Sequence, residues 1–484
     1  MRNILTWMRH RLSQSVFLRS VLILVGSTAL GQGIVVLLAP VLTRIYTPAD
    51  FGVLATFASI ISVIVVVLSL RYEQAIVLPE QHRVAVALMG LSLSLIFILS
   101  FAIAIALWIL RDILLRLESF HADFLWLLPL GLLGAGLYQV MNFWALRIQA
   151  FGYIARTRLV QGFGMVLTQL GLGLAGLGSV GLLVGEVVGR VGGSWTLLVL
   201  LRGVTLRELF DMQQMLYAAK RYLRFPLYNA GAALLNTFSL QLPFLLLPSL
   251  FDNEVAGFFA LAYRVLGLPS FFVGHAVAQA FLSRAAMLKG VPEELANLTA
   301  RTALGLLALG IAMFTVIAIG GAGLFGLFFG ESWRQAGVYA QIMAPWYMLW
   351  LVSSSLSGLL AIREWQGAGL AFTVVELLTR GLALWVGARL HSDVFTVALV
   401  SLVGVAISLM ALIWFLRAGY VDLGYIAPRA LSLLGVGLVY ASFLWVLREM
   451  LGLWGLLGAI PIVGLGSYWW VKRGEGWGVK GASL

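Results

Sequence analysis

The chain has 484 residues, of which 61% are hydrophobic and only 11% charged, with a formal net charge of +12 and no cysteine. A soluble globular domain carries roughly 25% charged residues, so the composition excludes that class and indicates an all-α polytopic membrane protein. The lack of cysteine excludes disulfides, thiolate nucleophiles and cysteine-ligated zinc.

Apolar segments long enough to cross a bilayer recur along the whole sequence. We predict about 14 transmembrane helices, near residues 18–39, 51–71, 84–110, 124–146, 159–178, 180–201, 227–250, 256–283, 302–329, 336–362, 368–388, 394–416, 430–447 and 452–471. Arginines precede the first segment as in a signal peptide, but the segment is long and no convincing Ala-x-Ala site follows. We therefore expect an uncleaved first helix.

The distribution of lysine and arginine predicts the orientation of these helices. With both termini in the cytoplasm, most basic residues fall in the inside loops, whereas the acidic residues divide evenly between the two sides. This asymmetry is what the positive-inside rule expects. The high net charge therefore reports membrane topology, and it gives no reason to expect a nucleic-acid partner.

A weak internal repeat divides the chain. The stretch around 43–66 resembles 248–272, with Tyr46 over Phe251 and Gly52 over Gly257. Six predicted spans separate the two copies, so both halves have the same orientation in the membrane, as in a parallel pseudo-twofold repeat.

This repeat predicts four regions. They are an N-terminal six-helix bundle at 1–202, a cytoplasmic amphipathic linker at 203–224, a C-terminal six-helix bundle at 225–420, and a terminal helix pair with a basic cytoplasmic tail at 421–484. Partial helical spacing of apolar residues in the linker, closed by a cluster of basic residues, is typical of an interfacial helix.

Charged residues well inside the spans are the main candidates for chemistry. Glu186 and Arg190 share one predicted helix, and Glu376 and Arg380 share another, each pair spaced i, i+4. One interpretation is that each pair neutralises itself and only packs. The other is that the pairs line a polar cavity, with the arginines binding an anion and the glutamates a proton or Na⁺.

Arg264 differs from these pairs because no acidic residue lies within one helical turn of it. An arginine at that depth must face water, a ligand or another helix, and its guanidinium group suits phosphate. Arg44, in the outer turn, and Arg71, at the inner end of the second span, extend a basic path in the first half. A solvated turn residue and a snorkelling anchor are the simpler interpretations of those two.

Enzyme and metal signatures are weak. Two G-x-G-x-x-G matches, at 171–176 and 321–326, lie inside predicted membrane helices without a preceding strand, so they carry no nucleotide-binding prediction. The sequence has no P-loop, no H-E-x-x-H and no G-x-S-x-G, and its five histidines are scattered. We predict no catalytic residues, no metal site and no cofactor.

Two adjacent motifs carry a family resemblance. The segments L-T-R-I-Y-T-P-A-D-F-G at 42–52 and R-Y-E-Q-A-I-V-L-P at 71–79 resemble the polysaccharide-transporter branch of the multidrug/oligosaccharidyl-lipid/polysaccharide (MOP) exporter superfamily, the Wzx-type O-antigen and exopolysaccharide flippases. The resemblance implies two bundles in a V around a central cavity. It also implies a bacterial inner-membrane protein that moves an undecaprenyl-pyrophosphate-linked oligosaccharide from the cytoplasmic to the periplasmic leaflet by alternating access.

The resemblance further implies that basic cavity residues hold the pyrophosphate. Arg264 is the first candidate and Arg71 the second, with Arg44, Arg190 and Arg380 as further substrate contacts. Glu376 and Glu186 are the candidates for coupling to H⁺, Na⁺ or the membrane potential. The implied partners are membrane lipids, a polysaccharide polymerase and a chain-length regulator.

Three other functions stay open. A cation-coupled multidrug antiporter of the same superfamily would use acidic cavity residues, which Glu186 and Glu376 supply. A membrane glycan polymerase or ligase would be an enzyme with a large outer loop, and no predicted outer loop is long enough. A peptidoglycan-precursor flippase is a further transport alternative.

Overall fold

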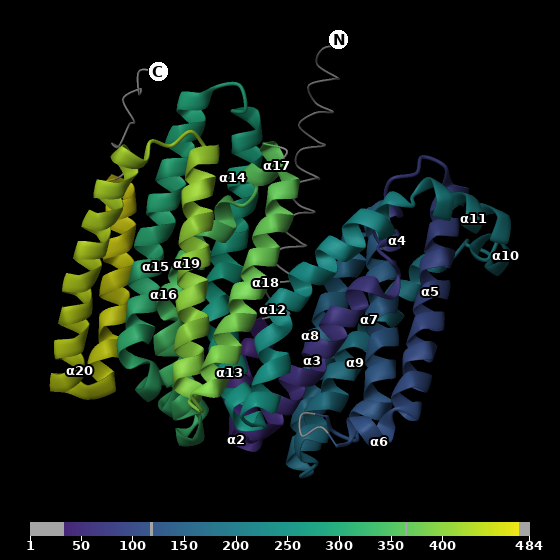
Figure 1. The fold of residues 1–484 in the computed structure, drawn as a ribbon, viewed down its shortest axis with the longest axis horizontal. Coiled ribbons are helices and arrows are strands. Elements are labelled where there is room, and N and C mark those ends of the chain that lie inside the picture. Colours follow the sequence, from purple (N-terminus) through teal and green to yellow (C-terminus); the bar gives the residue numbers. More distant parts are fainter. Residues whose placement is uncertain (1–32, 117–119, 364, 474–484) are drawn as a thin grey trace. The chain divides into compact units, whose positions relative to one another are not determined.

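The computed structural model describes residues 33–116, 120–363 and 365–473 (Figure 1). Every regular element in this part of the chain is helical. Contacts group the chain into two compact units, Met1–Asn253 (unit 1) and Glu254–Leu484 (unit 2). This boundary lies beyond the predicted linker at 203–224, and the predicted repeat halves stay a prediction.

Unit 1 consists of helices that follow one another in antiparallel runs. They are α2 (Ala39–Ile45), α3 (Pro48–Leu68), α4 (Tyr72–Ala75), α5 (His82–Ile109), α6 (Arg111–Leu114), α7 (Phe124–Arg147), α8 (Phe151–Leu174), α9 (Gly178–Leu198), α10 (Leu206–Leu209), α11 (Met212–Arg221) and α12 (Gly231–Leu250). A 3₁₀ turn at Val199–Leu201 follows α9, and a π-helical turn at Phe225–Ala230 leads into α12. Helix α3 packs against α7, α9 and α12.

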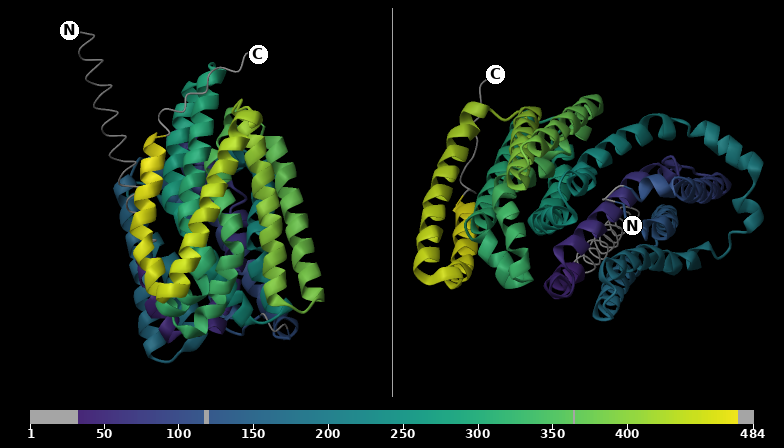
Figure 2. Two further views of the ribbon diagram at one scale, coloured as in Figure 1. Left: turned by 90° about the vertical axis from the view of Figure 1, so that its left-hand side faces the viewer. Right: turned by 60° about the horizontal axis from the view of Figure 1, so that its bottom comes forward.

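Unit 2 is built from a second set of long helices. They are α13 (Asn253–Pro269), a π-helical turn at Ser270–Gly274, α14 (His275–Met287), α15 (Pro292–Phe329), a 3₁₀ turn at Glu331–Trp333, α16 (Arg334–Leu356), α17 (Leu359–Ile362), α18 (Gln366–Arg389), α19 (Asp393–Ala418) and α20 (Leu423–Arg473). Helix α16 packs against α15 and α19, and α18 packs against α19. Helix α20 reverses at Gly452, where φ is 62°, and forms two segments (Figure 2).

Eleven helical segments in the described part of the chain are long and apolar enough to cross a membrane. They coincide with eleven of the predicted spans, so the chain is a multi-pass helical membrane protein, with fewer candidate spans than the predicted 14 or so. The first prediction, 18–39, falls mostly outside the described residues, as does the basic tail after 473. The predictions at 159–178 and 452–471 fall on α8 and on the second segment of α20, which are helical but are not among the eleven.

Local chemistry explains where α3 begins and ends. The Thr47 hydroxyl accepts a hydrogen bond from the Asp50 amide at 3.2 Å, and the Asp50 carboxylate accepts one from the Thr47 amide at 2.9 Å. This reciprocal pair is a capping box, and Pro48 fits the first helical position. At the other end, Leu70 and Arg71 adopt positive φ values of 50° and 65°, which ends the helix.

Glycines at every fourth position of α9, at 181, 185, 189 and 193, form a stripe that allows close helix packing. A Cβ added to Gly185 would lie 2.3 Å from Cγ of Gln169, and one added to Gly193 would lie 2.3 Å from Nε2 of Gln161. The stripe of α9 therefore faces α8, whose amide side chains occupy the room that the glycines leave. This contact accounts for the stripe by packing alone.

Candidate functional site

A buried ion pair lies among aromatic rings in unit 2. Arg380 and Glu376, both on α18, approach to 2.5 Å between Nη2 and Oε1, and their side chains are 3% and 18% exposed. The guanidinium carbon of Arg380 lies 5.6 Å from the ring centroid of Trp346 on α16, within cation–π range. The predicted pairing is therefore present, and it places a fixed positive charge inside the helices of this unit.

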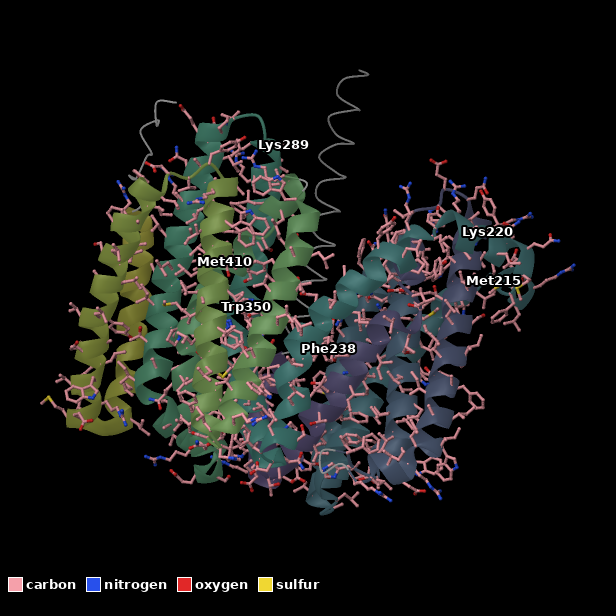
Figure 3. All side chains as sticks on the ribbon, in the orientation of Figure 1. Met215, Lys220, Phe238, Lys289, Trp350 and Met410 are labelled. Carbon is pink, nitrogen blue, oxygen red and sulfur yellow. The ribbon has the colours of Figure 1, made fainter. Side chains whose placement is uncertain are left out.

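Two tyrosines complete this cluster. The rings of Tyr263, on α13, and Tyr347, on α16, meet edge to face with centroids 5.7 Å apart. Both side chains lie close enough to Arg380 to interact with its charge. Trp350 continues the aromatic run, with its ring 5.6 Å from that of Tyr347 (Figure 3). Three helices thus bring together a guanidinium group, a carboxylate, two hydroxyls and several aromatic faces in the interior of unit 2.

Arg264 directly follows Tyr263 on α13, and its side chain is exposed on unit 2. The described contacts place Tyr263 in the cluster around Arg380.

The second predicted pair lies in unit 1 on α9. Arg190 donates from Nε to Oε1 of Glu186 at 2.8 Å, and its Nη2 lies 2.7 Å from the same oxygen. The Arg190 and Glu186 side chains are 24% and 15% exposed, so this pair is less enclosed than the pair on α18. The i, i+4 spacing produces the geometry that the sequence predicts.

A third cluster, which the sequence did not identify as a site, surrounds Glu73. The Glu73 side chain is fully buried, accepts a hydrogen bond from Gln139 Nε2 at 2.9 Å and another from the Ser69 hydroxyl, and lies 3.8 Å from Nη1 of Arg71. Burial raises the pKa of the Glu73 carboxyl above its usual value. Glu73 lies in the short helix α4, outside the spans, and connects the end of α3 to α7.

Two guanidinium groups of unit 1 keep a buried N–H without a hydrogen-bond partner among the described residues. They are Nε of Arg71 and Nε of Arg158 on α8. Arg158 also lies over the ring of Tyr138, 5.4 Å from its centroid. Since buried donors are almost always satisfied, these two N–H groups are candidate donors to a ligand or to water.

The sequence missed Glu73 and Arg158 because both lie just outside the predicted span ends at 71 and 159. In the structure α8 begins at Phe151, so Arg158 lies inside the helix. Arg44, the last predicted substrate contact, lies on α2 and is exposed. No group of three or more histidine, aspartate or glutamate residues that could hold a metal occurs in the part of the chain that the structure describes.

Comparison with known proteins identifies the family. The sequence model of the polysaccharide biosynthesis protein family matches residues 41–337. The chain belongs to this family. The matched region contains both motifs at 42–52 and 71–79, the pair on α9 and Arg264, whereas Glu376 and Arg380 lie beyond it. A search of curated protein sequences finds no match.

Solved structures show which fold this polysaccharide biosynthesis protein has. The lipid II flippase MurJ, in an inward closed conformation, matches with a TM-score of 0.74 and 11% identity, over 94% of this chain and 98% of that one. An inward-facing multidrug resistance MATE family transporter of the MOP superfamily matches with a TM-score of 0.65 and 15% identity, over 79% of this chain and 93% of that one. The predicted resemblance to polysaccharide transporters is thus confirmed in the polysaccharide biosynthesis family and in a fold like that of these two transporters.

Proposed function

We propose that this protein is a flippase for an undecaprenyl-pyrophosphate-linked oligosaccharide, carrying it from the cytoplasmic to the periplasmic leaflet for O-antigen or exopolysaccharide synthesis. The observation that carries the proposal is the combination of a polysaccharide biosynthesis family match with a fold like that of a lipid II flippase over 94% of the chain. A family that makes polysaccharides on lipid carriers needs a step that moves the finished unit across the membrane.

The arginines bind the pyrophosphate in this proposal. A guanidinium group inside the membrane needs an anion or water as a partner, and it offers bidentate donors to phosphate oxygens. Arg264 makes the main contact from α13 of unit 2. Arg71, Arg44 and Arg190 serve the same purpose in unit 1, where the unsatisfied Nε groups of Arg71 and Arg158 add two donors.

The aromatic cluster of unit 2 holds the sugars. Sugar rings present hydroxyls at their edges and C–H groups on their faces, so hydroxyl donors beside aromatic faces suit them. Tyr263, Tyr347 and Trp346 supply both, with Arg380 at their centre. This cluster lies partly beyond the family-matched region, which suits a role in recognising a glycan that differs between members.

The ion pairs supply coupling. An incoming phosphate competes with Glu376 for Arg380, or with Glu186 for Arg190, because each arginine can bind either anion. The displaced carboxylate then needs H⁺ or Na⁺ to stay neutral in the membrane, so phosphate binding and cation binding at each pair are linked. In this scheme the transporter needs no cofactor and performs no covalent chemistry.

The proposed location is the bacterial inner membrane, with both termini in the cytoplasm. The positive-inside distribution of basic residues supports that orientation. The proposed partners are the lipid-linked glycan, the surrounding lipids, and a polysaccharide polymerase and chain-length regulator that use the flipped product.

A cation-coupled multidrug antiporter is the second candidate. The likeness to a MATE family transporter and the two intramembrane glutamates favour it. Each glutamate, however, has an arginine as its direct partner, so the pairs present no excess negative charge to a cationic drug. The likeness in fold to a flippase and a transporter favours a transporter over a membrane polymerase or ligase.

Lipid extracts from cells that lack the protein test the proposal. Accumulation of a complete undecaprenyl-pyrophosphate-linked repeat unit, cleared when the gene is restored, is the expected result. Unchanged lipid-linked glycan together with greater sensitivity to cationic drugs would overturn it in favour of the antiporter.

A further inference from the structure

The segment between α9 and α12 forms an exposed surface in which apolar and cationic side chains alternate. The sequence predicts one interfacial helix over 203–224, whereas the structure has two short helices, α10 and α11, separated at Phe210 and Asp211. One face of α11 packs against the other helices of unit 1. Met215 (Figure 3) and Ala218 are buried, and α11 packs against α5. The Tyr72 hydroxyl donates to the Ala219 carbonyl at 3.1 Å.

A neighbouring face of α11 is apolar and exposed. Met212 and Leu216, one turn apart on α11, are 64% and 56% exposed, and Leu223, in the turn that follows the helix, is 48% exposed. Leu206 and Phe210, in and just after α10, are exposed as well. Exposed apolar side chains of this size, gathered on one short segment, indicate contact with a hydrophobic phase or a partner.

The remaining face carries the positive charge. Lys220, Arg221 and Arg224 are all exposed. Arg221 donates from Nη1 to the Tyr217 hydroxyl at 2.8 Å and lies near the rings of both Tyr217 and Tyr222, 6.0 and 5.8 Å from their centroids. Tyrosine and arginine side chains of this kind are favoured at the level of lipid headgroups.

The acidic residues of the segment are engaged in helix capping. The Glu208 carboxylate accepts from the Thr205 amide and hydroxyl at 3.0 and 2.9 Å. The Asp211 carboxylate accepts from the Gln213 and Gln214 amides at 3.1 and 3.2 Å. Both carboxylates therefore accept hydrogen bonds from backbone amides. Among the described contacts of the segment between α9 and α12, the cationic side chains of α11 make no ion pair with an acidic residue.

We propose that α10 and α11 form a binding surface for anionic phospholipids of the cytoplasmic leaflet. The apolar face of Met212, Leu216 and Leu223 enters the acyl boundary, and Lys220, Arg221 and Arg224 bind the headgroup phosphates beside it. A nucleic acid would not cover the leucine and methionine side chains, and an acidic protein would not require them. Through the Tyr72 contact the lipid-bound α11 is tied to α4, the helix that carries Glu73.

The absence of native cysteine allows a direct test by site-specific labelling. Leu216→Cys is labelled with a nitroxide, the protein is reconstituted in vesicles of phosphatidylcholine with increasing phosphatidylglycerol, and collision with oxygen and with a water-soluble nickel complex reports the depth of the label. We expect the label to move from water into the bilayer as the anionic lipid increases. The triple variant Lys220→Gln, Arg221→Gln, Arg224→Gln should need roughly tenfold more anionic lipid or fail to insert.

Two further measurements make the result decisive. Removing three charges elsewhere, by Arg284→Gln, Lys289→Gln and Arg301→Gln, should leave the label depth unchanged. A second label at Met212→Cys guards against local damage at position 216. A label that stays in water in every lipid would overturn the proposal, and so would equal insertion in pure phosphatidylcholine. Since label depth is read without transport, the proposal and the proposed function fail independently.

Discussion

Separate removal of the two charges on α18 should distinguish a structural pair from a working one. Three variants are needed: Glu376→Gln, Arg380→Gln and the double variant. The side chains of this pair are 18% and 3% exposed, so solvent screens their interaction little. The prediction is that the glutamate variant unfolds most easily, the arginine variant less so, and the double variant least of the three.

The magnitudes follow from burial. Two unit charges about 4 Å apart attract by about 4 kcal/mol at an effective dielectric constant of about 20, and the desolvation of both groups offsets much of that gain. Removing Glu376 leaves an Arg380 charge that cannot be neutralised, at a cost of about 3–5 kcal/mol. Removing Arg380 costs less, because the remaining carboxylate can take up a proton. Removing both charges is close to neutral.

Thermal unfolding of the purified variants in detergent measures the first part of the prediction. For a unit of the size of Glu254–Leu484, a loss of about 3 kcal/mol lowers Tm by roughly 6–12 °C. The corresponding variants of Glu186 and Arg190 provide the comparison, and their effects should be smaller because that arginine is 24% exposed. Equal or additive losses in the single and double α18 variants would refute the electrostatic reasoning.

Transport by the double variant measures the second part. If Arg380 exchanges Glu376 for the substrate phosphate, the double variant should have nearly the wild-type Tm and still accumulate lipid-linked oligosaccharide in cells. Normal transport by this variant would show that the pair serves only in packing. Both residues would then have no place in the proposed coupling scheme.

Three further predictions concern single positions. Arg264→Ala should abolish transport with unchanged Tm, because the side chain is exposed on α13 and binds the pyrophosphate in our proposal. Burial raises the pKa of Glu73, so the folded state is stabilised by a bound proton that is lost as pH rises through the folded-state pKa. The wild type should therefore lose stability as pH rises, whereas Glu73→Gln should not. In thermal unfolding, the Tm of Glu73→Gln should rise relative to that of the wild type with increasing pH. Gly52→Ala should lower stability by about 1–3 kcal/mol in the same assay, because the added Cβ would lie 1.8 Å from the Asn253 carbonyl oxygen.

Each of these predictions has a matched control. Arg284→Ala removes an exposed arginine from α14 and should transport normally; equal loss in both variants would show that Arg264 acts only through general charge. Glu73→Ala should destabilise at every pH, since it leaves the Gln139 amide without its acceptor. Gly152→Ala places a Cβ where nothing lies within 4 Å, so a loss equal to that of Gly52→Ala would contradict the close-contact argument.

The helices and both intramembrane ion pairs followed from the sequence because their causes are local. Continuous apolar runs mark the spans, and an acid four residues before an arginine on a helix can reach it without help from another element. The same reasoning did not identify site residues that lie just beyond the ends of the predicted spans. Glu73 and Arg158 each lie one or two residues outside a predicted boundary, and their surroundings come from α7, which only the folded structure brings to them.

The aromatic surroundings of Arg380 could not be predicted for a different reason. Tyr263, Trp346 and Tyr347 come from α13 and α16, more than thirty residues away in the chain from Arg380. No periodicity within one helix reveals which residues of another helix it meets. A tyrosine in a membrane helix has many satisfactory environments, so residue type alone gave no reason to place Tyr263 in this cluster.

The residues that reveal the family serve mainly to shape α3. Thr47 and Asp50 cap its first turn, Gly52 allows the backbone of Asn253 to approach, Arg71 adopts the left-handed conformation at its end, and Glu73 joins that end to α7. A motif made of caps, a close contact and a helix stop identifies a fold. It carries no information about the glycan, because none of these contacts depends on the ligand.

Substrate choice must then reside in side chains that the fold does not require. Arg264 is exposed, so its replacement costs the fold little. The hydroxyls of Tyr263 and Tyr347 and the ring of Trp346 surround a charge that packing alone would not place there, since apolar residues of similar volume would fill the same space at lower cost. In our proposal, Arg380 offsets that cost by binding the substrate phosphate during part of the transport cycle. The region around α16 and α18 is therefore where changes in glycan specificity should be sought.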